Sequence, residues 1–387
     1  MKYTRTALGL LTRQYRSVLK KCFLINLGLF VLSAPAKAAT TVTTYDALLS
    51  ALAGSSTADV VLDRSGNGMT ITGDGFEISE NQKVALKNIG TADVSSWNNG
   101  SGTDYAHRTP SNFFIKNDRG TLSLNDIIID DAYIRFSEVG NDALIRNYYS
   151  GHITQIKDVS FTNIYITGAS SMGGIITNST YYSSEHPVDY TATIDLIQNV
   201  TAKDILYAPD NAGAPHGGFI ENHNKGHIGT IDNLHIENFT MRTDPSITGG
   251  NHGIIDNQAY STIDKIINSE FINSYLYRPG HDTVSKTKNN HASAAGLYNQ
   301  GNIGLIENVR FEGNHVMTEF KRADDEGKYS GSGGGAAIMS FLGGIGGDVT
   351  ADNYVGIGKI KNEQFISNRV ENYEPAHAGA VTMGGGK

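Results

Sequence analysis

Cysteine is nearly absent from this sequence, and its absence excludes several kinds of structure and chemistry. The only cysteine among the 387 residues is Cys22. It lies in an N-terminal segment that we expect to be removed, so the remaining chain has no disulfide and no thiolate chemistry. An exported protein of this size without disulfides must be stabilised by a regular hydrogen-bonded core, and the lack of disulfides favours a bacterial origin.

A hydrophobic run long enough to span a membrane is missing from the N-terminal segment. The apolar run FLINLGLFVLS, residues 23–33, is too short to cross about 30 Å of hydrocarbon. It follows a basic stretch that has no acidic residue, and it precedes Ala36-Lys37-Ala38, which matches an A-x-A cleavage site. The pattern predicts a signal peptide over residues 1–38, removed on export, so the protein is expected in or beyond the periplasm.

Basic residues are also scarce relative to acidic ones. Residues 1–38 hold seven of the 31 basic residues, which leaves 24 (31 minus 7) against 39 acidic residues and a net charge near −15. A nucleic-acid partner would require a clustered basic face, so this class of partner is excluded. The negative charge suits a soluble, self-repelling exported protein, for which we expect a monomer.

A repeated pattern of apolar residues and asparagines occupies most of the chain. IGTIDNLHIENFTM from Ile228 and IDKIINSEFINSYL from Ile263 share the pattern I-x-x-I-x-[ND], followed by a further apolar residue. The pattern recurs roughly every 30–55 residues, which marks a repeat architecture. The second apolar residue of each unit, here called its marker, is Leu124, Ile156, Ile197, Ile231, Ile266, Ile306 or Ile360.

A second signature precedes each unit and usually ends in asparagine, as in GFIEN (218–222) and GIIDN (253–257). Both signatures alternate and are rich in Ile and Phe, which predicts strands of about four to six residues. Helical periodicity is missing between them, so repeats built from helix pairs are excluded. The sequence predicts an all-β fold, a right-handed parallel β-helix (β-solenoid) in which each unit forms one coil of three short strands.

The asparagines that end the second signature have a predicted structural role. Equivalent residues of successive coils stack about 4.8 Å apart, so each amide can donate to one neighbour and accept from the other. Asparagine also tolerates the left-handed backbone conformation needed at corners between strands. We predict a structural ladder at such a corner, formed by Asn117, Asn147, Asn178, Asn222 and Asn257.

The segment after the signal peptide differs from the repeats. It predicts an amphipathic helix that covers the first coil. The residues that indicate this helix are Thr44 as N-cap, Tyr45, Leu48, Leu49 and Leu52 on one face, and Gly54 after the end. Short strand-like pieces follow, and then a polar stretch, 93–110, which we expect to be a loop. We therefore predict three parts: the signal peptide, an N-terminal cap with the first coils over residues 39–105, and the repeated β-helix over residues 106–387.

The repeats resemble the passenger domains of Gram-negative autotransporter proteins. GGFIENHNKGHIGTIDNLHIENF, residues 217–239, is similar to the pattern GGAIYN…IGxIxGxFxxN that many such passengers repeat. The resemblance implies export through the inner membrane, followed by display at the outer membrane and cell surface or by secretion. A family member continues into a C-terminal outer-membrane β-barrel, whereas this chain stops at Lys387. We therefore expect an N-terminal fragment or a truncated gene product.

Two functions remain open for such a scaffold. As an adhesin it would bind a glycan or protein on a host or neighbouring cell through its loops, without a cofactor. The tyrosines near the loops, such as Tyr148 and Tyr277, suit that role, although capping of coil edges explains them equally well. As a polysaccharide lyase or glycosidase it would need clustered carboxylates, for which Asp130–Asp131 and Asp324–Asp325–Glu326 are candidates.

Neither carboxylate cluster favours catalysis. Adjacent residues of a regular strand point to opposite faces, which separates Asp130 from Asp131, and the other cluster lies in a Gly-rich loop. Histidines are also candidates, because His216, His223 and His227 lie close together and histidines bind metals. No cysteine and no carboxylate at ligand spacing accompanies them. We therefore assign no catalytic, cofactor-binding or metal residue, and favour adhesion.

Overall fold

The computed structural model describes residues 38–70, 75–93, 113–136, 143–169, 173–180, 190–211, 216–243, 252–278, 293–318, 335–341, 356–372 and 380–384. Most of the predicted signal peptide and most of the polar stretch 93–110 lie outside these residues. The chain divides into two units, Met1–Ala39 and Thr40–Lys387, and nearly all described residues belong to the second. Among the described residues, no helix combines the length and the apolar character needed to cross a membrane.

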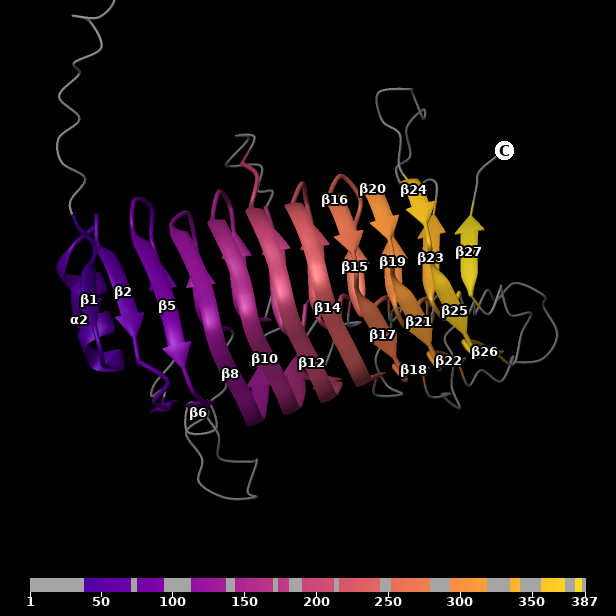
Figure 1. The fold of residues 1–387 in the computed structure, drawn as a ribbon, viewed down its shortest axis with the longest axis horizontal. Helices are drawn as coiled ribbons and strands as arrows, with labels where there is room; N and C mark the ends of the chain where they lie inside the picture. The colour runs from indigo at the N-terminus through magenta and orange to yellow at the C-terminus, as the bar shows by residue number, and fades with distance from the viewer. Residues whose placement is uncertain are drawn as a thin grey trace, which may run out of the picture. The chain divides into compact units, whose positions relative to one another are not determined.

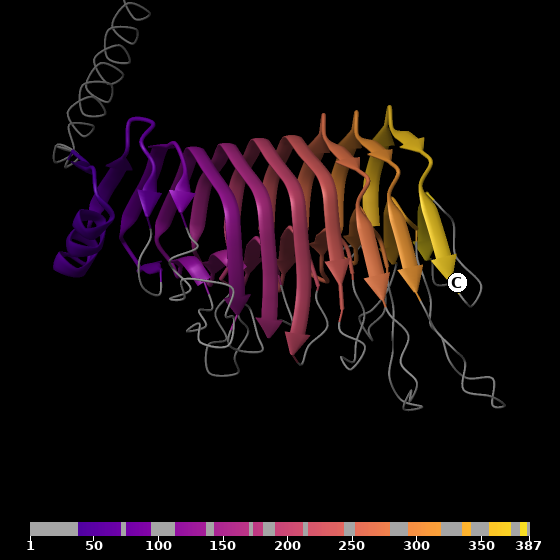
Figure 2. The ribbon, with the colours of Figure 1, turned by 90° about the horizontal axis from the view of Figure 1, so that it is seen from below.

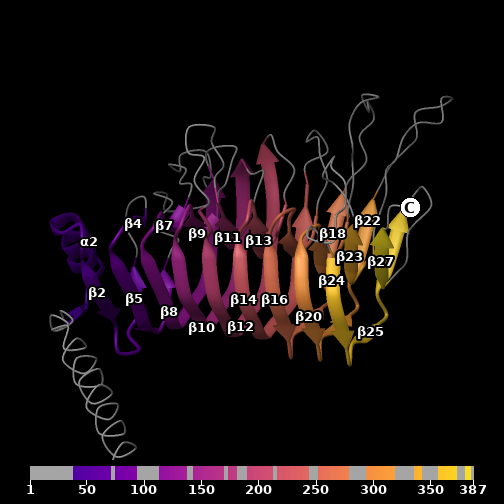
Figure 3. The same ribbon diagram turned by 90° about the horizontal axis from the view of Figure 1, so that it is seen from above.

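Parallel strands dominate the second unit and form two long sheets. The strands of the main sheet lie side by side in chain order from β1 to β24 (Figure 1). The second sheet runs from β4 to β27 in the same direction, and its row of short strands runs alongside the main sheet (Figure 3). Each strand pairs with its counterpart one coil away, in parallel. The predicted all-β parallel β-helix is confirmed.

The strands of the main sheet are β1 (Thr40–Val42), β2 (Asp59–Asp63), β5 (Lys83–Ile89), β8 (Thr121–Phe136), β10 (His152–Ala169), β12 (Thr193–Asn211), β14 (His227–Arg242), β16 (Thr262–Ile267), β17 (Glu270–Ile272), β18 (Tyr275–Arg278), β20 (Asn302–Glu307), β21 (Arg310–Glu312), β22 (His315–Thr318), β24 (Gly356–Lys361), β25 (Gln364–Ile366) and β26 (Arg369–Asn372). Those of the second sheet are β4 (Phe76–Ile78), β7 (Phe113–Asn117), β9 (Ala143–Tyr148), β11 (Ile176–Ser179), β13 (Ile220–His223), β15 (Ile255–Asn257), β19 (Leu297–Asn299), β23 (Ile338–Phe341) and β27 (Val381–Gly384). A further pair consists of β3 (Met69–Thr70) and β6 (Ala92–Asp93).

Each coil of the repeated region has four straight segments, and not the three that we predicted. The coil that begins with β15 continues through β16, β17 and β18. In earlier coils the last three segments join into one long bent strand, such as β14, and the bends are visible in the magenta and pink strands of Figure 2. The additional segment arises because a second left-handed corner, such as Asn273 between β17 and β18, divides the piece that follows the marker strand.

The bends between segments occur at residues with a left-handed backbone. All seven residues that stand two positions after a marker have φ between 52° and 57°. Asparagine and aspartate adopt this conformation more readily than other residues with a side chain. The predicted ladder asparagines do not have positive φ, so the left-handed conformation that we expected for them was wrong. The seven corner residues are Asp126, Asp158, Asn199, Asn233, Asn268, Asn308 and Asn362.

The core is a set of apolar columns that run along the stack of coils. The sheet register pairs Ile231 with Ile266 and Ile266 with Ile306, as expected from the repeat. Markers from Leu124 to Ile306 are at most 2% exposed, whereas Ile360 in the last described main-sheet coil is 36% exposed. A parallel column contains Phe271 and Phe311, whose rings stack at 5.0 Å. Each apolar side chain in these columns is buried against its counterparts in the preceding and following coils, and this burial is the main hydrophobic contribution to stability.

Helix α2 (Tyr45–Gly54) lies against β2 at the N-terminal end of the stack (Figures 1 and 3). Thr44 is its N-cap, as predicted, because the backbone N–H of Ala47 donates to the Thr44 hydroxyl at 3.2 Å. The buried side chain of Gln82 donates to the carbonyls of Leu52 and Ser55, which attaches the other end to the first coils. Gly54 is the last helical residue and Ser55 the C-cap, so the predicted end was one residue early.

Candidate functional site

The outer face of the second sheet carries two fully buried carboxylates. Side chains alternate between faces along a strand, so in β13 Ile220 and Asn222 face the core and Glu221 faces outward. The register pairs Glu221 with Asp256 and Asp256 with Tyr298 in the next coils. Glu221 and Asp256 are nevertheless 0% exposed. Burial of two neighbouring carboxylates is costly, which makes this face the chemically unusual part of the described chain.

Two histidines approach Asp256 from the segments that precede β13 and β15. Nδ1 of His252 lies 3.0 Å from Oδ2 of Asp256, and Nδ1 of His216 lies 3.7 Å from the same oxygen. The two Nδ1 atoms are 2.9 Å apart, and the imidazole rings meet edge to face. The side chains of His216 and His252 are 27% and 15% exposed, so the cluster is reached from solvent on the histidine side.

Gln258 completes the group and Tyr298 supports it. The Gln258 amide nitrogen lies 2.5 Å from Oδ2 of Asp256 and 3.0 Å from Nδ1 of each histidine. The ring of Tyr298, one coil further on, stacks on His252 at 4.5 Å. Its hydroxyl accepts a hydrogen bond from Gln300 at 2.7 Å. Residues from three successive coils therefore set the orientation of one small polar centre.

Glu221 and His223 form a less satisfied pair beside this centre. Nδ1 of His223 lies 3.9 Å from Oε1 of Glu221, which is too far for a hydrogen bond. Within the described residues, neither carboxylate oxygen of Glu221 nor Nδ1 of His223 has a hydrogen-bond partner. The Gly173 amide is close enough to lower the pKa of Glu221 but falls short of hydrogen-bond geometry.

The environments of the two carboxylates move their pKa values in opposite directions. Burial raises the pKa of Glu221 well above its usual range, and the charge of Asp256 raises it further. Burial also acts to raise the pKa of Asp256, but the charge and hydrogen bond of His252, together with the nearby His216, outweigh it and lower this pKa to about 2. Burial lowers the pKa of His216, and it lowers the pKa of His223 to about 4. Of the two carboxyl groups, Glu221 therefore keeps its proton to a higher pH than Asp256.

The predicted ladder asparagines lie on the other face of these strands, inside the coil. Each amide nitrogen from Asn117 to Asn257 donates to the next asparagine oxygen at 2.8 Å, and Asn257 donates in the same way to Asn299. Asn299 then donates to the Ser340 hydroxyl at 3.1 Å. All these asparagines are fully buried. The ladder satisfies polar groups in the core and presents no surface for a ligand.

Of the other residues singled out from the sequence, those that the structure describes do not come together in a site. Asp131 is at a corner with φ of 57°, so the regular strand assumed for it and Asp130 is interrupted there, while Asp130 accepts from Asn163. His227 pairs with Asp264 of the next coil, away from His216. Tyr148 is only 1% exposed and Arg146 lies over its ring, which favours the coil-edge role. Asp324–Asp325–Glu326 lies outside the described residues.

Sequence reasoning grouped His216 with His223, whose pKa it helps to lower, and with His227, but it missed the direct contacts of His216. Its neighbours His252 and Asp256 stand one coil later, so no local spacing indicates them. The available signal was the alignment of GFIEN with GIIDN, which puts Glu221 and Asp256 at equivalent positions with histidines just before each. Read across coils, this alignment brings acidic residues and histidines together.

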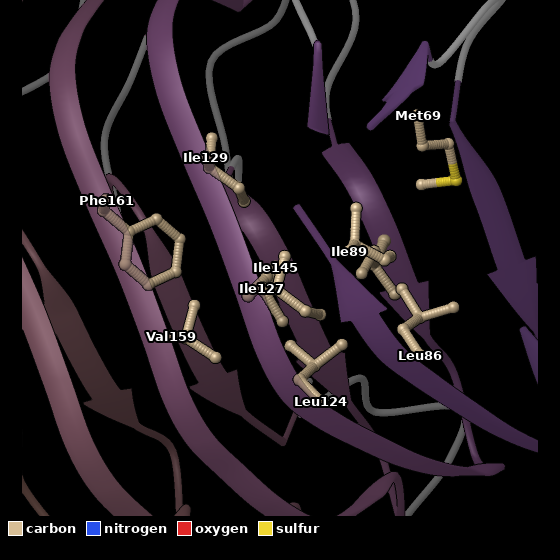
Figure 4. A pocket seen from close by; sticks show the side chains of 10 residues that line it. Met69, Leu86, Ile89, Leu124, Ile127, Ile129, Ile145, Val159 and Phe161 are labelled. Carbon is tan, nitrogen blue, oxygen red and sulfur yellow. The ribbon is translucent and has the colours of Figure 1, made fainter. Parts of the chain in front are cut away.

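A small apolar cavity lies in the N-terminal part of the core (Figure 4). Its volume is about 10 Å³, and side chains such as Leu124, Ile145 and Phe161 line it. This space holds at most one water molecule, and its lining offers no polar partner for one. A ligand site would need a few hundred Å³.

The fold places the chain in the class of parallel β-helix proteins, with a cluster of partly buried histidines and buried carboxylates on one sheet. Comparison with family models, with curated proteins and with solved structures gives no match for this chain.

Proposed function

We propose that this protein is an exported, autotransporter-like passenger that is displayed at the cell surface or secreted, and that it binds a surface glycan or protein. The observation that carries the proposal is the common position of the inserted segments. Residues 279–292 follow β18 and residues 319–334 follow β22, and the last residues of these strands, Arg278 and Thr318, are paired in register. The strands that follow, β19 and β23, also pair with each other.

This arrangement supports binding through the inserted segments. Both segments leave the coil at the end of the third main-sheet segment, so their attachment points lie in adjacent coils on one edge of the stack. A regular scaffold tolerates such insertions because coil stability depends on nearest neighbours and loop closure costs little. The repeated positions themselves are devoted to core columns and hydrogen-bonded ladders.

The experiment replaces residues 279–292 and 319–334 with short Gly-Ser linkers. We expect the β-sheet circular-dichroism signal and the melting temperature to stay within a few degrees of the parent protein. Attachment of the purified protein to cultured cells and to a glycan array should fall at least about tenfold, which corresponds to 1.4 kcal/mol. A control variant keeps the length and composition of both segments in shuffled order and should also bind poorly. Attachment at the parent level would contradict the proposal.

A polysaccharide-degrading enzyme is the second candidate, favoured by one observation. Glu221 and Asp256 are neighbouring carboxylic groups with opposed pKa shifts, as an acid and base pair requires. Their complete burial denies a polysaccharide access, so this function ranks below adhesion. Release of reducing sugar by the parent protein, with loss of that activity in Glu221→Gln and Asp256→Asn, would reverse the ranking.

A further inference from the structure

The atoms His216 Nδ1, His252 Nδ1, Asp256 Oδ2 and the Gln258 side-chain amide converge on a single point between two coils. All six distances among these four atoms lie between 2.5 and 3.7 Å. Four ligands held tetrahedrally at 2.0–2.1 Å from a zinc ion are about 3.3 Å from one another. The four polar atoms therefore already occupy nearly the corners of a metal-coordination tetrahedron.

Hydrogen bonding alone does not account for this convergence. The Gln258 amide nitrogen has two protons but three polar neighbours, because Oδ2 of Asp256 lies at 2.5 Å and Nδ1 of each histidine lies at 3.0 Å. An amide nitrogen does not accept a hydrogen bond, so at least one of these contacts is not a hydrogen bond. Rotation of the amide by 180° places two oxygens 2.5 Å apart instead. A cation at the centre removes the conflict, because two imidazole nitrogens, a carboxylate oxygen and an amide oxygen all then present lone pairs to it.

We propose that His216, His252 and Asp256, with the amide oxygen of Gln258, form a binding site for a divalent transition-metal ion of the zinc type. Two imidazole nitrogens in the donor set favour zinc, cobalt or nickel over calcium and magnesium, which prefer oxygen ligands alone.

The surroundings of the four atoms have the features of a built site. Tyr298 stacks on His252 and restricts the rotation of the ring. Asp256 is fully buried, so its position is set by the strand and not by solvent. His216 comes from the coil of β13, whereas His252, Asp256 and Gln258 come from the coil of β15. The ion would therefore clamp adjacent coils together, a structural role that is independent of the proposed adhesion.

The test begins with the full-length protein, stripped of metal and then titrated with Zn²⁺. We expect about one Zn²⁺ per chain by elemental analysis, an increase of several degrees in the melting temperature, and reversal by a chelator. Co²⁺ should give the visible absorption bands of a tetrahedral site. Ca²⁺ at the same concentration should neither bind stoichiometrically nor change the melting temperature.

His252→Ala and Asp256→Asn should abolish stoichiometric binding and the Zn²⁺-dependent increase in melting temperature. The matched control is His152→Ala, because His152 also bridges two coils through a carboxylate, Asp195, at 2.7 Å but has no third ligand among the described residues. This control should bind Zn²⁺ as the parent does. If His252→Ala or Asp256→Asn fails to fold, the Co²⁺ spectrum of the parent protein tests the proposal instead. The proposal is wrong if the parent shows no tetrahedral Co²⁺ bands and binds less than about 0.1 Zn²⁺ per chain. It is also wrong if His152→Ala loses as much Zn²⁺ binding as the other two variants.

Discussion

At the scale of single residues, asparagine serves this protein in two distinct ways. The interior ladder stacks fully buried amides, as at Asn222, which accepts from Asn178 and donates to Asn257. The corner asparagines, such as Asn233, are exposed and provide positive φ, although they too exchange hydrogen bonds with neighbouring coils. The first kind prevents unsatisfied polar groups in the core, and the second kind turns the chain.

Replacement of an interior ladder residue should be much more damaging than replacement of a corner residue. Asn222→Ala leaves the Asn178 donor and the Asn257 acceptor buried without their partner, which should cost about 2–5 kcal/mol. Asn233→Gly keeps the left-handed conformation available and removes only an exposed amide, so its cost should be under about 1 kcal/mol. Chemical denaturation of both variants measures the difference. Similar losses would contradict the distinction between the two ladders.

Glu221 should make the stability of the protein depend on pH. The pKa of Glu221 is higher in the folded state than in the unfolded state. At pH values between these two pKa values the folded state binds more protons, so the protein loses stability as the pH rises through this range. The slope is about 1.4 kcal/mol for each pH unit within that window. Glu221→Gln keeps a neutral side chain of the same shape, so it should raise the melting temperature at pH 8 and have little effect at pH 4.

The control for this measurement is Glu237→Gln. Its hydrogen bond with Lys203 lowers the pKa of Glu237, so its contribution has the opposite sign and is lost as the pH falls. Glu237→Gln should not raise the melting temperature at pH 8. A lower melting temperature for Glu221→Gln at pH 8 would show that the ionised form is stabilised in the fold, against the argument from burial.

At the scale of the strand, one residue position separates core from surface. Ile266 is 1% exposed and packs between Ile231 and Ile306 of the neighbouring coils. The adjacent Lys265 is exposed and pairs with Thr230 and Leu305 on the outer face. The alternation of side chains along a strand explains this contrast.

Ile266→Ala should lower the free energy of unfolding by about 2–5 kcal/mol, because it opens a cavity between two coils. Lys265→Ala, in the same strand and coil, should change it by less than about 0.5 kcal/mol. Urea denaturation followed by circular dichroism gives both values. Comparable losses at the two positions would mean that the inward and outward faces of β16 are misassigned.

At the scale of the whole solenoid unit, the parallel register converts equivalent positions into contacts between coils. Residues 35 positions apart, such as Asn222 and Asn257, become direct hydrogen-bond partners. Insertions between coils leave this register intact: Phe311 still pairs with Phe365 across a separation that includes residues 319–334. Core and insertions can therefore change independently, which is compatible with the proposed binding role of the inserted segments.

Much of this fold could be predicted from the sequence, because the solenoid repeats its local pattern. The spacing of Ile, Phe and Asn within each unit is local information, and it was enough to predict the strands, the marker column and the β-helix. The number of segments per coil was not predictable in this way. Whether SEFINSYL forms one strand or two depends on the left-handed corner at Asn273, and the backbone conformation of a single asparagine is not evident from its neighbours.

The sequence by itself determined the repeat, and with it which residues stack on which in adjacent coils. Only the tertiary structure decided what the residues outside the repeated pattern do. His216 and His252 occupy unequal positions before their strands, and they meet at Asp256 only because of the path that the chain takes into β13 and β15. The physical reason is that stacking at a fixed spacing follows from periodicity, whereas the direction of a side chain at the edge of a strand follows from the packing around it.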